Sequence, residues 1–98
     1  MDTPYAFVAR IEAKRDKAED VAALLAGALP LAQAEPGTVA WDAARTSLTT
    51  FWIFDTFGSE DARQAHINGE IAAALMAKAD ELLAGPPEIL PADVLASK

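Results

Sequence analysis

Apolar and polar positions alternate at the start of the chain. The alternation places two sets of side chains on opposite sides of residues 5–14: Tyr5, Phe7, Ala9 and Ile11 on one side, and Val8, Arg10 and Glu12 on the other. A period of two is typical of a β-strand, so we expect a strand over this segment.

A helical period follows the first strand. Asp16 and Glu19 have the spacing of a capping box, which predicts a helix that begins at Asp16. Apolar residues then recur at helical intervals, at Val21, Leu24, Leu25, Ala28 and Leu29. Pro30 cannot donate to the carbonyl four residues earlier, so it should kink or shorten this helix.

The segment Glu35-Pro36-Gly37 interrupts the pattern and precedes two further predicted strands, at 38–45 and 48–57. The short polar link Thr46-Ser47 between them indicates an antiparallel hairpin. The second strand is apolar on both faces, with Phe51, Ile53 and Phe57 on one and Leu48, Trp52 and Phe54 on the other. Both faces must therefore be covered.

The rest of the chain predicts a short helix, a long helix and a strand. Ser59 is a suitable N-cap for a helix that runs toward His66 and breaks at Asn68-Gly69. The longer helix carries Ile71, Leu75, Ala79, Leu82 and Leu83, and Gly85 is expected to end it as the C′ residue. A last strand spans 88–96, where Pro91 favours an edge position.

The predicted order is β-α-β-β-α-β, the split βαβ arrangement of ferredoxin-like α+β domains: a four-stranded antiparallel sheet with both helices on one face. Two helices cover only one face, which leaves Trp52 and Phe54 on an uncovered apolar face. A large exposed apolar face indicates an interface or a ligand site. We therefore expect a homodimer in which two such faces meet and enclose one pocket per subunit.

Length and charge narrow the class of protein. The 98 residues predict one domain over 1–98, with a core from about 5 to 96. A net charge of −7 disfavours nucleic acids and anionic membranes as partners. No apolar run is long enough to span a membrane and no basic-then-apolar signal opens the chain, so we expect a cytoplasmic protein. The chain has no cysteine and one histidine, which excludes thiolate or His-rich metal sites within one copy.

Several motifs resemble the antibiotic biosynthesis monooxygenase family of small dimeric α+β barrel proteins. They are Ala-Arg-Ile-Glu-Ala-Lys at 9–14, Ala-Glu-Pro-Gly-Thr at 34–38, Phe-Asp-Thr-Phe at 54–57 and Arg-Gln-Ala-His-Ile at 63–67. The resemblance covers residues 5–96 and implies a dimeric α+β barrel with His66 at the rim of its cavity.

The chain departs from the family pattern at several positions. Asp55 stands where the family often has Glu, and Phe57 stands where it often has Trp or Tyr. The haem-degrading branch relies on an Asn, Trp and His set, and here His66 and Met76 occupy the Trp and His positions. Haem degradation is therefore not expected.

His66 and Asp55 are the candidate catalytic residues. His66 titrates near neutral pH and could take a proton from a phenol or enol, or it could serve structure by pairing with Asp55 or a backbone carbonyl. Asp55 lies among apolar neighbours and could orient His66, or it could form a structural ion pair or accept at a helix cap. Its candidate partners for an ion pair are Arg10, Arg45 and Arg63.

Trp52, Tyr5, Phe54 and Arg10 are the candidate substrate-binding residues. Aromatic side chains suit flat, electron-rich ligands, and Tyr5 and Trp52 also carry a polar group. Core or interface packing is the alternative for each aromatic residue. Arg10 could hold an anionic oxygen of a ligand, or it could form a cross-strand or intersubunit salt bridge.

These residues lead to three alternatives for function. The first is a cofactor-independent monooxygenase that oxidises a small aromatic, quinol or polyketide-like substrate with O₂. The second is a non-catalytic small-molecule-binding dimer, or an isomerase that uses the same pocket. The third is a structural dimer with a filled cavity. No cofactor is expected, because the sequence has neither a dinucleotide-binding glycine motif nor a phosphate-binding loop.

Overall fold

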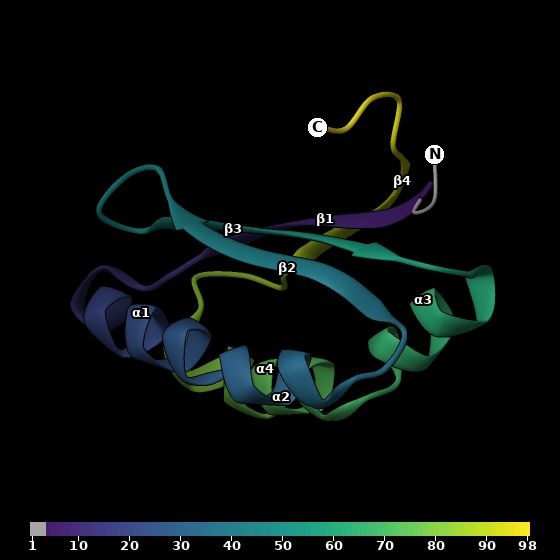
Figure 1. Ribbon diagram of the computed structural model, residues 1–98. Coiled ribbons are helices and arrows are strands. Elements are labelled where there is room, and N and C mark those ends of the chain that lie inside the picture. The colour runs from purple at the N-terminus through teal and green to yellow at the C-terminus, as the bar shows by residue number, and fades with distance from the viewer. Residues whose placement is uncertain (1–3) are drawn as a thin grey trace.

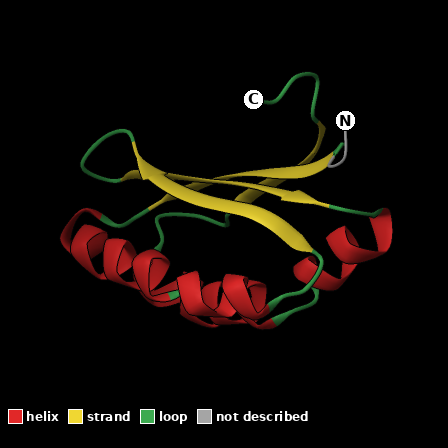
Figure 2. Cartoon of the chain, in the orientation of Figure 1, coloured by secondary structure: helices red, strands yellow, loops and turns green. Residues whose placement is uncertain are grey.

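A computed structural model describes residues 4–98, which adopt the predicted ferredoxin-like α+β fold. One antiparallel sheet, in the strand order β2-β3-β1-β4, lies on a single layer of helices (Figure 1, Figure 2). The elements are β1 (Tyr5–Glu12), the 3₁₀ turn η1 (Arg15–Lys17), α1 (Ala18–Gly27), α2 (Leu29–Ala34), β2 (Thr38–Arg45), β3 (Thr50–Phe57), α3 (Glu60–Ile67), α4 (Glu70–Leu82) and β4 (Glu88–Asp93). None of the helices formed by these residues is long and apolar enough to cross a membrane.

The first helical region begins later than predicted and is divided in two. The prediction of a capping box at Asp16 is wrong, because α1 begins at Ala18 and the side chain of its N-cap residue, Lys17, forms no capping hydrogen bond. The backbone of Lys14 is still extended and donates to the carbonyl of Leu82, so the chain enters α1 through the turn η1. The interruption predicted at Pro30 is confirmed, since α1 ends at Gly27 and Pro30 lies in the first turn of α2.

The central hairpin has the predicted faces but a longer connection. Phe51, Ile53 and Phe57 are buried on the helix side of β3, while Trp52 and Phe54 lie on the opposite face. The strand begins at Thr50 rather than at 48, because the four-residue loop 46–49 closes with a bond from the Thr46 N–H to the Thr50 carbonyl. Leu48 therefore lies in this loop and is 59% exposed.

The second helical region follows the prediction except at its end. The Ser59 hydroxyl accepts from the Ala62 N–H at 3.1 Å and caps α3, and the break at Asn68-Gly69 separates α3 from α4. The prediction that Gly85 ends α4 as its C′ residue is wrong. A C′ glycine has a positive φ, and no glycine among residues 4–98 has one. The helix ends because Leu83 turns extended and forms a bridge to Ala13.

The last strand lies at the sheet edge beside β1, as Pro91 predicts, but it ends at Asp93 rather than at 96. The chain after it lies on the side of the sheet away from the helices (Figure 1).

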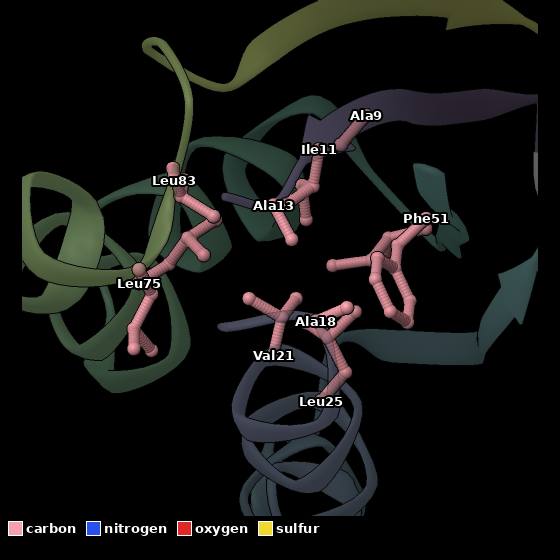
Figure 3. Close-up of a cluster of buried hydrophobic side chains, with 11 residues drawn as sticks. Ala9, Ile11, Ala13, Ala18, Val21, Leu25, Phe51, Leu75 and Leu83 are labelled. Carbon is pink, nitrogen blue, oxygen red and sulfur yellow. The ribbon is translucent and has the colours of Figure 1, made fainter. Parts of the chain in front are cut away.

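The main hydrophobic core lies between one face of the sheet and the helices. Side chains of β1 and β3 meet those of α1 and α4 there (Figure 3). The cluster comprises Ala9, Ile11, Ala13, Ala18, Val21, Leu25, Phe51, Ile53, Leu75, Leu82 and Leu83. Ile11 and Val21 are completely buried, so this core anchors α1 and α4 to the two central strands.

The opposite face, which we call the open face, carries no helix. Leu90, Val8 and Phe54 are cross-strand neighbours on it, and Phe54 is 43% exposed. Although the chain after β4 lies on this side, Leu95 is 91% exposed and does not pack against the sheet. The predicted imbalance, with helices on one face and apolar side chains on both, is confirmed.

Replacing Ile11 by alanine is expected to lower the free energy of unfolding by about 2–5 kcal/mol, because a buried aliphatic side chain is lost from the close-packed core. Denaturant titration measures this change. Leu95→Ala is the control, and it should change stability by no more than about 0.5 kcal/mol. Equal effects of the two substitutions would contradict the placement of the core.

Candidate active site

Asp55 and His66, the two candidate catalytic residues, lie in contact on the helix side of the sheet. Asp55 is on β3 and 2% exposed, and His66 is in the last turn of α3 and 8% exposed. His66 Nε2 lies 2.9 Å from Asp55 Oδ2. This contact favours the interpretation that Asp55 orients and pairs with His66.

The arginines predicted as partners of Asp55 bind other groups. Each forms an ion pair with a glutamate on or near the surface: Arg10 with Glu12, Arg45 with Glu19 and Arg63 with Glu60. Arg10 and Arg45 belong to exposed pairs, and the guanidinium of Arg63 donates to the carbonyls of Ala6 and Ala92. The prediction of an arginine partner for Asp55 is therefore wrong.

The position of His66 depends on how α3 packs against the loop before β2. A Cβ built on Gly37 would overlap the Cβ of Ala62, so a larger residue at Gly37 would push α3 away from this loop. On the other side, the His66 ring lies 5.1 Å from the Phe57 ring, centroid to centroid. The loop and β3 together hold the imidazole over Asp55.

Glu35 is the functional candidate that sequence reasoning missed. Its Oε1 lies 2.7 Å from His66 Nδ1 and also accepts from the Thr38 hydroxyl at 2.7 Å. Glu35 belongs to the Ala-Glu-Pro-Gly-Thr motif, which the sequence analysis used as a chain break and as a family feature. The motif was the available signal, but nothing local indicates a contact with a residue 31 positions away.

His66 is therefore held between two carboxylates. Burial by itself would lower the pKa of the imidazole, but the contacts with Asp55 and Glu35 outweigh it and raise the pKa above the ordinary value of 6.5. An ionised carboxylate only accepts hydrogen bonds, so two such contacts require a hydrogen on each ring nitrogen. The raised pKa therefore favours the imidazolium form of His66.

A small cavity adjoins this cluster on the helix side, and we call it the helix-side cavity. Its volume is about 30 Å³, which is about the space that one water molecule occupies in the liquid. Asp55 and His66 contribute the polar groups of a largely apolar wall formed by Phe7, Ala9, Ile53, Ile67, Ile71, Ala72, Leu75 and Ile89. Asp55 Oδ1 is buried and has no hydrogen-bond partner within residues 4–98, so it is free to accept from a ligand.

None of the four predicted substrate-binding residues lines the helix-side cavity. Tyr5 is on the helix side at the end of β1, where the Arg63 guanidinium lies 5.4 Å from its ring centroid. Trp52, Phe54 and Arg10 lie on the open face, where the Trp52 indole donates to Thr46 and Arg10 pairs with Glu12. Because the sheet lies between, these three cannot touch a ligand that contacts Asp55 and His66 of the same chain. Their substrate contact stays a prediction that concerns the other face.

Acidic and histidine side chains between residues 4 and 98 form no group of three or more that could hold a metal ion. The two carboxylates and the imidazole of the cluster can form hydrogen bonds and transfer protons.

Comparisons with known proteins agree on the fold. Residues 4–78 match the family model described as antibiotic biosynthesis monooxygenase. A crystal structure of a protein of unknown function from Nitrosomonas europaea has 50% sequence identity and a TM-score of 0.96, covering 99% of this chain and 94% of that chain. A protein from Pseudomonas aeruginosa has 24% identity and a TM-score of 0.82, covering 98% of each chain.

A structure named as an antibiotic biosynthesis monooxygenase has 15% identity and a TM-score of 0.80, covering 94% of this chain and 99% of that chain. The comparison with curated proteins gave no match.

The raised pKa of His66 predicts a pH-dependent contribution to stability. The unfolded chain has the ordinary imidazole pKa, so the contribution is fully present below about pH 6.5 and is lost as the pH rises through the higher folded value. The difference in unfolding free energy between the wild type and His66→Gln should therefore shrink between pH 6 and pH 9. Denaturant titrations at each pH measure it, and His66 is the only histidine in the chain. A difference that grows with pH would contradict the charged cluster.

Proposed function

The chain belongs to the antibiotic biosynthesis monooxygenase family, and we propose that it is a cofactor-independent monooxygenase acting on a small phenolic or quinol-type aromatic substrate at the helix-side cavity. Membership of the family supports monooxygenase chemistry in general terms. The finer assignment depends on one observation, the buried and unpaired Oδ1 of Asp55 beside the cavity.

A buried acceptor without a donor is unfavourable, and a ligand that brings a hydroxyl group relieves the cost. In the proposed complex, the hydroxyl of the substrate donates to Asp55 Oδ1, while His66 stays on Oδ2 at 2.9 Å. The aromatic body of the substrate then lies against the apolar wall. The Asp55–His66 pair is neutral in this complex, and once Asp55 has taken the substrate proton, the imidazolium balances the charge of the substrate anion.

Asp55 then acts as the general base. Transfer of the hydroxyl proton to Oδ1 leaves an electron-rich anion, which gives one electron to O₂, and the resulting radical and superoxide combine to form a C–O bond. At a methylene carbon of an anthrone, one oxygen atom becomes the new carbonyl and the other leaves as water with both hydrogens. The substrate supplies all the electrons, so the step needs no external reductant. The protein contributes orientation, exclusion of water and the proton acceptor.

The volume of the cavity requires a conformational change. A cavity that accommodates one benzene ring has a volume of about 150 Å³, whereas the helix-side cavity has about 30 Å³. Substrate entry must therefore separate the helices from the sheet locally. The same small volume favours a second candidate, a closed domain that binds a small ligand without oxidising it.

The open face supports the proposal of a homodimer. Trp52, Phe54 and Leu90 present apolar surface there, and no element of residues 4–98 covers Phe54 or Leu90. The family is one of dimeric α+β barrels, in which two such sheets face each other. In this arrangement the open face forms the interface, and each copy keeps its own helix-side cavity.

Removing the proposed base should reduce turnover. Asp55→Asn is expected to lower the kcat of oxygen consumption with an anthrone or quinol substrate by about 100-fold or more, the usual contribution of a general base. An oxygen electrode measures the rate on metal-free protein. Asp20→Asn, a matched change at an exposed position on α1, should leave the rate unchanged. If the wild type is thermally stabilised by these compounds and consumes no oxygen, the binding function replaces the monooxygenase.

Disrupting the open face should separate the dimer. Light scattering of the wild type at micromolar concentration is expected to give twice the chain mass of 10.3 kDa, and Phe54→Asp should give the single-chain mass because it places a charge in the interface. Met76→Asp alters a similarly exposed apolar residue on α4, outside the sheet, and should leave the dimer intact. A wild type that scatters as a single chain would rule out the interface.

A further inference from the structure

Glu35 contacts the one ring nitrogen of His66 that Asp55 does not. The two carboxylates approach the imidazole from opposite ends, at 2.7 Å on Nδ1 and 2.9 Å on Nε2. They come from different elements, Glu35 from the loop between α2 and β2 and Asp55 from β3. A neutral imidazole has only one N–H and would leave one carboxylate facing a lone pair. The geometry therefore favours a ring with a hydrogen on each nitrogen.

The carboxylate of Glu35 is itself fixed from two sides. The Thr38 hydroxyl donates to Oε1, the same oxygen that faces His66. Oε2 lies against Gly69, the N-cap residue of α4, where a Cβ would come within 3.2 Å of it. A negative charge is favoured at the N-terminus of a helix, because the first N–H groups point toward it. Glu35 is thus held in place by groups other than His66.

Other charged groups near the ring point elsewhere. Arg63, one turn earlier on α3, is directed to Glu60 and to the carbonyls of Ala6 and Ala92. Glu35 and Asp55 are the charged side chains that contact His66 from the elements packed against it. The protonation of the ring therefore depends on these two carboxylates.

We propose that Glu35 is a positioning residue: it keeps both hydrogens on the His66 ring, so that Asp55 stays paired with a positive charge through Oδ2 while its Oδ1 accepts from the substrate hydroxyl. The inference rests on the proposed function, because it assigns Glu35 a part in that reaction. Glu35 acts through His66 and does not touch the substrate.

Loss of the Glu35 charge has a definite consequence. Glu35→Gln keeps an oxygen that can accept from Nδ1–H, but it removes one of the two charges that raise the pKa of His66. The imidazole then loses its second hydrogen at a lower pH. The hydrogen that remains on the neutral ring lies on Nε2, beside the carboxylate of Asp55, while the amide of the introduced glutamine can donate to Nδ1. The cluster has then lost the positive charge that balances the substrate anion once Asp55 has taken the substrate proton.

The test uses the single histidine of the chain as its own reporter. ¹⁵N spectra of the wild-type imidazole at pH 7 should show hydrogens on both ring nitrogens, and a neutral ring at pH 7 would overturn the proposal without any variant. In Glu35→Gln the titration of His66 should move to lower pH. Glu70→Gln removes an exposed charge from the first residue of α4, one position after Gly69, and should leave the titration in place.

The functional readout is the pH profile with dithranol as the anthrone probe. The alkaline limb of oxygen consumption should move to lower pH in Glu35→Gln, so that the rate at pH 8 falls about tenfold or more while the rate at pH 6 stays near that of the wild type. Glu35→Asp keeps a carboxylate at this position and should lie between the two. A titration that moves while the limb stays fixed would overturn the positioning role and leave the proposed function intact.

Binding separates failure of the proposed function from failure of this inference. The proposal links the affinity for dithranol to the charge of His66 whether or not oxygen is consumed, so the pH dependence of binding should shift in Glu35→Gln in the same direction. A wild type that binds dithranol without consuming oxygen overturns the monooxygenase, and the shift then still supports Glu35. Binding with the same pH dependence in both proteins overturns the role of Glu35.

Discussion

The structure depends on neutralising one carboxylate buried in an apolar layer. Asp55 is 2% exposed, and a buried unpaired ion costs several kcal/mol even after the protein relaxes. His66 supplies the opposite charge, which it can do only if α3 lies directly against β3. The imidazolium in turn leaves Nδ1–H to be satisfied, and Glu35 accepts from it. The position of α3 and the path of the loop before β2 thus follow from the same charge.

Side chains alternate between the two faces of β3, and the two faces have different roles. The side chain of Asp55 points to the helices. The side chain of Phe54, the preceding residue, points away from them and lies on the open face. A shift of one residue in the register would exchange these sets, exposing Phe51 and Ile53 and placing Asp55 on the open face. One strand therefore determines both the proposed proton acceptor and the proposed dimer interface. This is why the residues predicted as one site are found on two faces.

The sequence signals that gave correct predictions reflect interactions between neighbouring residues. The hydroxyl of Ser59 caps the helix that follows it, and Pro30 interrupts its own helix, so both were predictable from a few neighbouring residues. The capping box at Asp16 and the C′ glycine at 85 failed because long-range backbone contacts intervened. Lys14 is held by the Leu82 carbonyl, and Leu83 is held by its bridge to Ala13.

The candidate site was predictable only in part for the same reason. Asp55 was recognised as a charge in an apolar strand, and His66 as the only imidazole, so their pairing could be put forward. Glu35 could not be found, because its contact with His66 joins segments 31 residues apart and depends on a loop path that no local pattern encodes. The three arginines predicted as ion-pair partners of Asp55 form ion pairs with glutamates instead.

The position of Glu35 also determines which wall of the helix-side cavity can move. Most of the sheet wall belongs to β1 and β3, each of which is hydrogen-bonded to a strand on both sides, and Ile89 of the edge strand β4 completes it. The His66 end of α3 is held by Glu35 and Asp55 together. Helix α4 contributes Ile71 and Leu75 to the cavity and joins α3 at Gly69, beside which Glu35 Oε2 lies. An opening that keeps Asp55 and His66 in contact therefore has to come from α4 or from the edge strand β4, because Glu35 and Asp55 hold the His66 end of α3 in place.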